Sequence, residues 1–117
     1  MKAFLKNYRQ SPRKVRLVAG LIRGKSVARA KTLLAFADQK SAPAILKLLN
    51  SAVVNAQAAG KDAKDLIIKE IMVDEGIVMK RSMPMARGRA NPYKKRSSRI
   101  TLALGEKTVA TKKTAKK

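Results

Sequence analysis

The spacing of apolar residues predicts three helices in the first half of the chain. Between Ser11 and Gly24, apolar positions recur at helical intervals and gather on one face. Those positions are Val15, Val18, Ala19 and Ile22. Ser26 and Ser41 are suited to cap two further helices, over residues 27–37 and 42–59, and Gly60 is suited to end the last one.

From Leu66 onward the apolar pattern changes to β-branched, partly alternating runs. Residues 66–79 and 100–104 have the composition of strands, and residues 3–8 form a weaker candidate. Pairing the two later runs as a hairpin with its tip near Gly88 sets Val73 opposite Leu104 and Ile77 opposite Ile100. Each side of this hairpin would then extend about 50 Å at ~3.3 Å per residue. The hairpin is therefore expected to be longer than the body is wide.

The charge of the chain changes this picture, because the net charge is +21 over 117 residues and the excess lies at the two ends. Residues 1–37 carry ten basic and no acidic side chains, residues 38–78 sum to −1, and residues 79–117 sum to +12. Repulsion on this scale destabilises a compact state unless a polyanion neutralises it. Nucleic acid is the commonest partner of this kind, and an anionic membrane is the main rival.

The residue types present exclude most enzyme chemistry. The chain has no Cys and no His, so disulfides, thiolate or imidazole metal sites and His-based catalysis are excluded. The acidic pair Asp74 and Glu75 invites an acid–base or metal interpretation, but neighbouring strand residues point to opposite faces, which favours a turn or a salt bridge. We therefore expect no enzyme, no metal and no cofactor.

No apolar run approaches the roughly 20 residues of a membrane span, and the start, MKAFLKNYRQ, lacks the apolar core of a signal peptide. We expect a soluble, intracellular protein that does not bind a membrane.

A stripe of arginines shares the other face of the first predicted helix. A solvated helix face would be the ordinary interpretation, but the first 37 residues contain no acid to pair with these side chains. The pattern therefore favours phosphate binding. A glycine within the stripe fits close approach of a partner backbone, and a tight helix–helix contact is the alternative. The residues are Arg13, Arg16, Gly20 and Arg23, with Arg9, Lys14 and Lys25 beside them.

The segment KRSMPMARGRANPYKKRSSR, residues 80–99, is the second candidate site. It has eight basic side chains and no acid, although strands flank it on both sides. Charges within about 8 Å of one another repel, so the segment is suited to insertion into a polyanion, where phosphates replace water and counterions. A flexible linker is the alternative. The basic residues are Lys80, Arg81, Arg87, Arg89, Lys94, Lys95, Arg96 and Arg99, and the apolar residues able to pack against bases are Met79, Met83, Pro84 and Met85.

Several blocks of the sequence resemble, in order, the bacterial large-subunit ribosomal protein twenty-two family. They are SPRKVRLVAGLIRGK, ILKLLNSAVVNA, VDEG, MKR, P-x-A-R-G-R-A and KKRSSRITLAL, and the resemblance runs from about residue 5 to residue 104. The resemblance implies an α+β fold, with three helices packed on a three-stranded antiparallel sheet and a long β-hairpin. Residues 1–105 would form one domain that includes the hairpin at about 73–104. Residues 106–117 lie outside the resemblance, and their basic, low-complexity composition predicts a disordered tail.

The resemblance also implies a function. The protein would be a structural constituent of the large ribosomal subunit, bind its RNA, aid subunit assembly, and line the nascent-peptide exit tunnel with its hairpin. Its partners would be large-subunit ribosomal RNA, neighbouring large-subunit proteins and the nascent polypeptide. RNA contacts are implied for Ser11, Arg13, Lys14, Arg16, Arg23, Lys25, Lys80, Arg81, Arg87, Gly88, Arg89, Lys95, Arg96, Ser97 and Ser98. The tunnel-lining tip would comprise Met83, Pro84, Met85, Ala86, Arg87, Gly88, Arg89, Ala90 and Asn91.

Two other interpretations remain open from the residues alone. One is an architectural DNA-binding protein that places a basic, proline-bearing β-arm in the minor groove. The other is a cationic membrane-active peptide, although the basic segment lacks an amphipathic helical stripe. Charge by itself does not separate RNA from DNA.

Overall fold

The computed structural model describes residues 1–107, and its first half contains the three helices that the apolar spacing predicts. They are α1 (Pro12–Ile22), α2 (Val27–Phe36) and α3 (Ala42–Ala58). Ser26 caps α2, because its side chain accepts a hydrogen bond from the Arg29 N–H at 3.4 Å. Ser41 does not cap α3: its own backbone is helical, and its hydroxyl is buried without a partner among the described residues.

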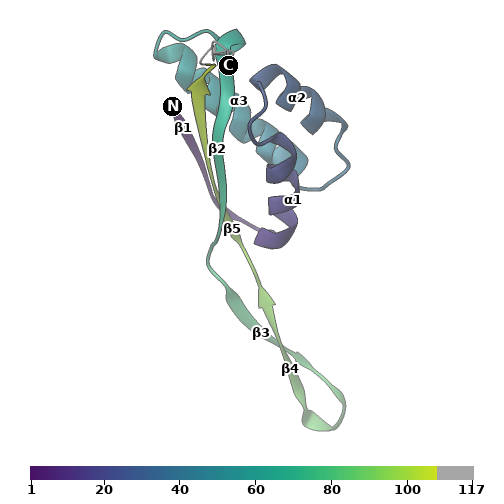
Figure 1. Cartoon of the computed structure of the whole chain (residues 1–117). Coiled ribbons are helices and arrows are strands. Elements are labelled where there is room, and N and C mark those ends of the chain that lie inside the picture. The colour runs from purple at the N-terminus through teal and green to yellow at the C-terminus, as the bar shows by residue number, and fades with distance from the viewer. Residues whose placement is uncertain (108–117) are drawn as a thin grey trace, which may run out of the picture.

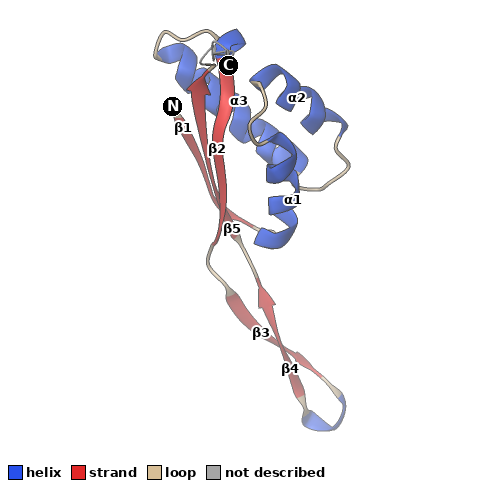
Figure 2. Cartoon of the chain, in the orientation of Figure 1, coloured by secondary structure: helices blue, strands red, loops and turns tan. Residues whose placement is uncertain are grey.

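Three antiparallel strands form the sheet of the body, in the order β1–β5–β2. Their bounds are β1 (Lys2–Tyr8), β2 (Leu66–Glu75, preceded by the 3₁₀ turn η1, Ala63–Asp65) and β5 (Ser98–Glu106). All three helices lie on one side of this sheet (Figure 2). The core fills the space between the two layers, and its largest fully buried side chains are Ile22, Ile45, Leu49, Leu66, Ile68, Ile71, Ile100 and Leu102. The fold class is the predicted α+β class.

A second, two-stranded sheet projects away from the body (Figure 1). It consists of β3 (Met79–Pro84), the turn η2 (Ala86–Gly88) and β4 (Ala90–Lys95), and we call residues 79–95 the arm. The described chain measures 73 × 40 × 24 Å, with a radius of gyration of 18.8 Å. A compact domain of a hundred residues has a radius near ~13 Å, so the arm dominates the shape as the sequence predicts.

The predicted register of the hairpin is wrong. Val73 pairs with Ile100 rather than Leu104, and Leu104 pairs with Ile68. The two registers differ by an even number of residues, so both keep the same side chains on the core face, and the apolar pattern cannot choose between them. Ile77 faces no strand residue, because the ladder is interrupted where residues 76–78 run beside residues 96–97.

Glu106 and Lys107, the first residues of the predicted tail, contact the body. Glu106 is the last residue of β5, and the Lys107 N–H donates to the Asp65 carbonyl at 2.7 Å. The predicted disorder of residues 108–117 lies outside the described residues.

Candidate nucleic-acid interface

The arginine stripe (Arg13, Arg16 and Arg23) lies on the exposed side of α1, beside the outer edge of β2, which among the described residues pairs with no further strand of the body sheet. Arg16 Nε and Nη2 both donate to the Val73 carbonyl oxygen, at 3.2 and 3.1 Å. Arg23 Nη2 donates to the Ile71 carbonyl oxygen at 3.0 Å. Two members of the stripe therefore satisfy backbone acceptors that an edge strand would otherwise leave to water.

These contacts orient the two guanidinium groups and leave some of their N–H donors available to bind a phosphate. A guanidinium carries five N–H donors in a planar fork, and the contact of Arg16 with Val73 leaves Nη1 free of described partners. A side chain already held in one orientation loses less conformational freedom when it binds a phosphate. The stripe is thus better preorganised than three solvated arginines would be.

A cavity of about 420 Å³ joins the start of α1 to the foot of the arm, and we call it the junction cavity. Arg13 and Arg16 reach it from the helix, and Arg96 reaches it from the link between β4 and β5. The structure thus brings together arginines from both sequence-predicted sites. The lining residues are Ser11, Pro12, Arg13, Arg16, Glu75 and Arg96.

The start of α1 adds to the positive potential of the junction cavity. The first turn of the helix contains no acidic residue, and Ser11 makes no side-chain cap. Helix N-termini carry a partial positive charge and free N–H groups, and therefore favour anions. Glu75 is the one acid in the cavity, with its Oε1 3.9 Å from Arg96 Nη1. Both side chains are substantially exposed, so this ion pair is weak.

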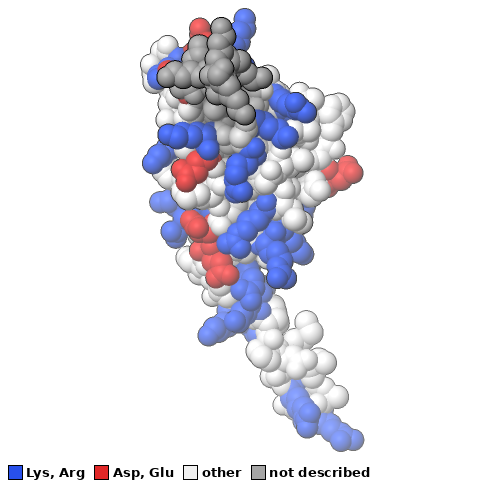
Figure 3. Space-filling model, in the orientation of Figure 1, with Lys and Arg blue, Asp and Glu red and all other residues white. Residues whose placement is uncertain are grey.

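The arm itself is exposed on both faces along its whole length. Lys80 pairs directly opposite Lys94, and Met79 opposite Lys95. Like charges directly opposite one another destabilise a ladder, and a two-stranded hairpin in water is only marginally stable. Figure 3 shows Lys and Arg side chains on the body and at the arm tip, with no Asp or Glu along the arm in this view. Anions around the arm would relieve the repulsion between these basic side chains.

The tip of the arm turns through two residues in the left-handed region. Arg87 has φ 62° and Gly88 has φ 70°, and the Met85 N–H donates to the Arg89 carbonyl oxygen at 2.6 Å to close the turn. The side chains of Met83 and Met85 are about half exposed, at 55% and 49%. The tip therefore offers both cations and apolar surface.

The remaining predicted contact residues are placed unequally. Lys14, Arg81 and Arg99 are exposed, and Arg9 lines a separate cavity of about 310 Å³ on another side of the arm's foot. Ser97 and Ser98 are buried, and each hydroxyl is bonded inside the protein. RNA contact by these two serines stays a prediction.

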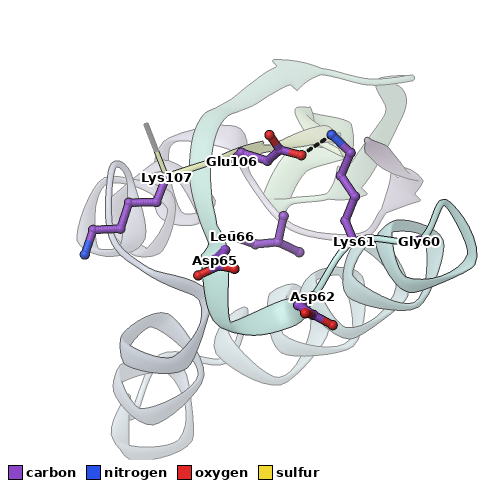
Figure 4. A pocket seen from close by; sticks show the side chains of 7 residues that line it. All are labelled: Gly60, Lys61, Asp62, Asp65, Leu66, Glu106 and Lys107. Carbon is purple, nitrogen blue, oxygen red and sulfur yellow. Dashed lines mark hydrogen bonds and ion pairs between the residues drawn. The ribbon is translucent and has the colours of Figure 1, made fainter. Parts of the chain in front are cut away.

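A further cavity lies at the end of the body opposite the arm and has mixed charge. Lys61 pairs with Glu106 across it, and Asp62 and Asp65 lie on its rim (Figure 4). Carboxylates repel phosphate, so this cavity is a poor nucleic-acid site. Within residues 1–107, no cluster of acidic side chains could hold a metal ion. The helices in that part of the chain are too short or too polar to cross a membrane.

Comparison with known proteins gives the context of this interface. The sequence profile of the family described as ribosomal protein L22p/L17e matches residues 3–105. The chain is 48% identical over 106 residues to the large ribosomal subunit protein uL22 of Herpetosiphon aurantiacus. The aligned region covers 90% of this chain and 94% of that relative, and so includes the body and the arm together. The chain belongs to the ribosomal protein L22p/L17e family.

Proposed function

We propose that the chain is a structural constituent of the large ribosomal subunit and binds ribosomal RNA with the arginine stripe, the junction cavity and the arm. As a member of its family it is a structural, non-enzymatic protein of the ribosome, located in the cytoplasm. The junction cavity is the observation that carries the RNA-binding surface, because it unites cations from residues 13–16 with Arg96. One RNA segment can then contact body and arm simultaneously.

We also propose that the arm inserts between RNA segments, aids subunit assembly and lines the nascent-peptide tunnel at its tip. The support is its exposure on both faces, its directly opposed lysines and the mixed cationic and apolar tip. Neighbouring proteins of the subunit and the nascent polypeptide are the further partners that this arrangement implies. Architectural DNA binding is the alternative that the experiment must exclude.

The first experiment measures affinity for a structured large-subunit RNA fragment as a function of salt. If six to eight phosphates are neutralised, log K against log salt falls with a slope of roughly −4 to −7. Arg13→Ala and Arg96→Ala should each make that slope shallower by about 1. Lys47→Ala is the matched control, because Lys47 lies on α3 beside β1, away from the junction cavity.

Two outcomes would contradict the proposal. A shallow slope for the parent chain excludes a surface that contacts many phosphates. Equal affinity for duplex DNA and ribosomal RNA at the same salt concentration favours the DNA-binding alternative. Photo-crosslinking from positions 13 and 96 adds a geometric test, because both positions should label neighbouring nucleotides.

A further inference from the structure

The foot of the arm is held by two buried hydroxyl groups. Ser97 is 4% exposed, and its Oγ donates to the Ile77 carbonyl oxygen at 2.5 Å. Ser98 is fully buried, and its Oγ donates to the Gln10 carbonyl oxygen at 2.5 Å. The first bond joins the two sides of the hairpin, and the second joins the hairpin to the segment that leads into α1.

The Gly76 backbone packs closely against Ser97, in a position where a side chain would collide with it. Its N–H donates to the Ser97 carbonyl oxygen at 2.9 Å. A Cβ on Gly76 would lie 2.6 Å from Ser97 Oγ and 3.3 Å from the Ser97 carbonyl carbon and oxygen. Because real Cβ atoms do not approach other atoms to 2.6 Å, a side chain at position 76 would displace the Ser97 hydroxyl from its bond to Ile77 and press on the Ser97 backbone.

These contacts occur where the strand ladder is interrupted. β2 ends at Glu75 and β3 begins at Met79, while β4 ends at Lys95 and β5 begins at Ser98. The body sheet and the arm sheet are therefore separate ladders. An interrupted ladder would bend freely unless other bonds bridged it. The Ser97 hydroxyl and the Gly76 N–H supply bonds within the interruption, and the Ser98 hydroxyl fixes the start of β5 against the segment that precedes α1.

We infer that Gly76, Ser97 and Ser98 are positioning residues that lock the arm in one direction relative to the body before RNA binds. The lock holds Arg96 beside Arg13 and Arg16 in the junction cavity. In this inference the serines affect RNA binding through the position of the arm, which is the alternative to the direct RNA contact predicted from the sequence. The consequence for RNA binding rests on the proposed function, whereas the direction of the arm is a property of the free protein.

The direct test measures the arm in the free, full-length chain. The chain has no native cysteine, so Ala28→Cys on α2 and Ala90→Cys on the arm provide two unique spin-label sites. Pulsed electron–electron double resonance should give a narrow distribution of the distance between the two labels in the chain that carries no other substitution. Gly76→Ala, Ser97→Ala and Ser98→Ala should each broaden or shift it. Ser82→Ala is the matched control, because Ser82 is exposed on β3 and its hydroxyl has no described partner.

A double-mutant cycle tests whether Gly76 and Ser97 act as one contact, and Ser98→Ala tests the lock independently of that cycle. Removing Ser97 Oγ also removes the atom nearest to a Cβ at position 76. The shift in distance distribution caused by Gly76→Ala should therefore be smaller in a Ser97→Ala background than in the parent chain. Additive shifts would mean that the two residues do not act as one contact.

RNA binding separates positioning from direct contact. Loss of one hydrogen bond from the lock should weaken RNA affinity by about 5-fold while leaving the salt slope unchanged, because no phosphate contact is lost. Weaker RNA binding with an unchanged distance distribution would overturn the inference in favour of direct serine–RNA contacts. If the parent chain bound no RNA at all, the proposed function would fail, and the distance measurements would still decide whether the lock exists.

Discussion

Arg16 of α1 and Val73 of β2 are joined by two hydrogen bonds to a single carbonyl oxygen, at 3.2 and 3.1 Å. The residues are far apart in sequence, and the contact fastens the first helix along the edge of the sheet. The same guanidinium lines the junction cavity. Arg16 therefore contributes to the folded state and belongs to the proposed RNA-binding surface, and the two roles can be separated experimentally.

Arg16→Ala should lower both stability and RNA affinity, whereas Arg13→Ala should lower RNA affinity alone. We expect Arg16→Ala to reduce the free energy of unfolding by about 1 kcal/mol, since Val73 loses a charged donor at a partly exposed site. Arg13 donates no described side-chain hydrogen bond within residues 1–107, so its replacement should change stability by no more than about 0.5 kcal/mol. Urea denaturation measures the first effect and RNA titration the second. Equal loss of stability in the two variants would contradict the assigned roles.

Gly20→Ala should stabilise the free protein and weaken its RNA binding. Gly20 lies within α1, and a Cβ there would meet no atom within 4 Å, which removes the alternative of a tight helix–helix contact. Ala is better than Gly in a helix interior by about 1 kcal/mol, so the melting temperature should rise. If an RNA backbone approaches the gap, affinity should fall despite the higher stability. Unchanged affinity would show that no close approach occurs there.

Lys94→Glu should have opposite effects on the free arm and on the complex. In the parent chain Lys94 lies directly opposite Lys80, and the substitution turns repulsion into attraction worth about 0.5 kcal/mol. Amide hydrogen exchange along β3 and β4 should slow, whereas RNA affinity should drop. Lys94→Gln separates the loss of repulsion from the gain of attraction, because it removes the positive charge at position 94 without adding a negative one. Faster exchange in Lys94→Glu would rule out the repulsive pairing.

Replacing residues 80–94 with Asn-Gly should leave the body folded. The pair Met79 and Lys95 would then be connected by a two-residue hairpin turn. No arm residue belongs to the hydrophobic core, so the melting temperature should stay within a few degrees. Arg96 and the junction cavity remain, so RNA binding should weaken without disappearing. Unfolding of this variant in circular dichroism would show that the arm supports the core.

The elements of the fold follow from local patterns, whereas their register does not. Apolar spacing places α1 and α3 close to their observed bounds, because a helix face repeats every few residues and needs no knowledge of its partner. The pairing of Val73 with Ile100 depends on how the tip closes at Arg87 and Gly88 and on the unequal links, residues 76–78 and 96–97, between the two ladders. That closure is a matter of backbone geometry that apolar alternation does not encode.

In the candidate site, too, the charges follow from the sequence, whereas the hydrogen bonds that position them do not. An acid-free arginine stripe is visible in sequence, because charge is a property of residues. The bonds of Arg16 and Arg23 to β2 require knowing which strand forms the edge of the sheet, and no sequence signal marks it. Ser97 and Ser98 look like small polar residues in a basic segment, and their burial becomes visible only once Gln10 and Ile77 lie beside them.

The hydrogen bonds that α1 and the residues after it make along β2 also affect how one copy of the free protein can contact another. A strand edge with unsatisfied carbonyls invites pairing with another chain, which is the first step of aggregation. The carbonyls of Ile71 and Val73 are already occupied, and the Ile68 carbonyl accepts from the Gly24 N–H at 3.1 Å. The β2 edge of the body sheet is thereby closed to strand pairing with another copy of the chain, whether or not the protein is bound to a partner.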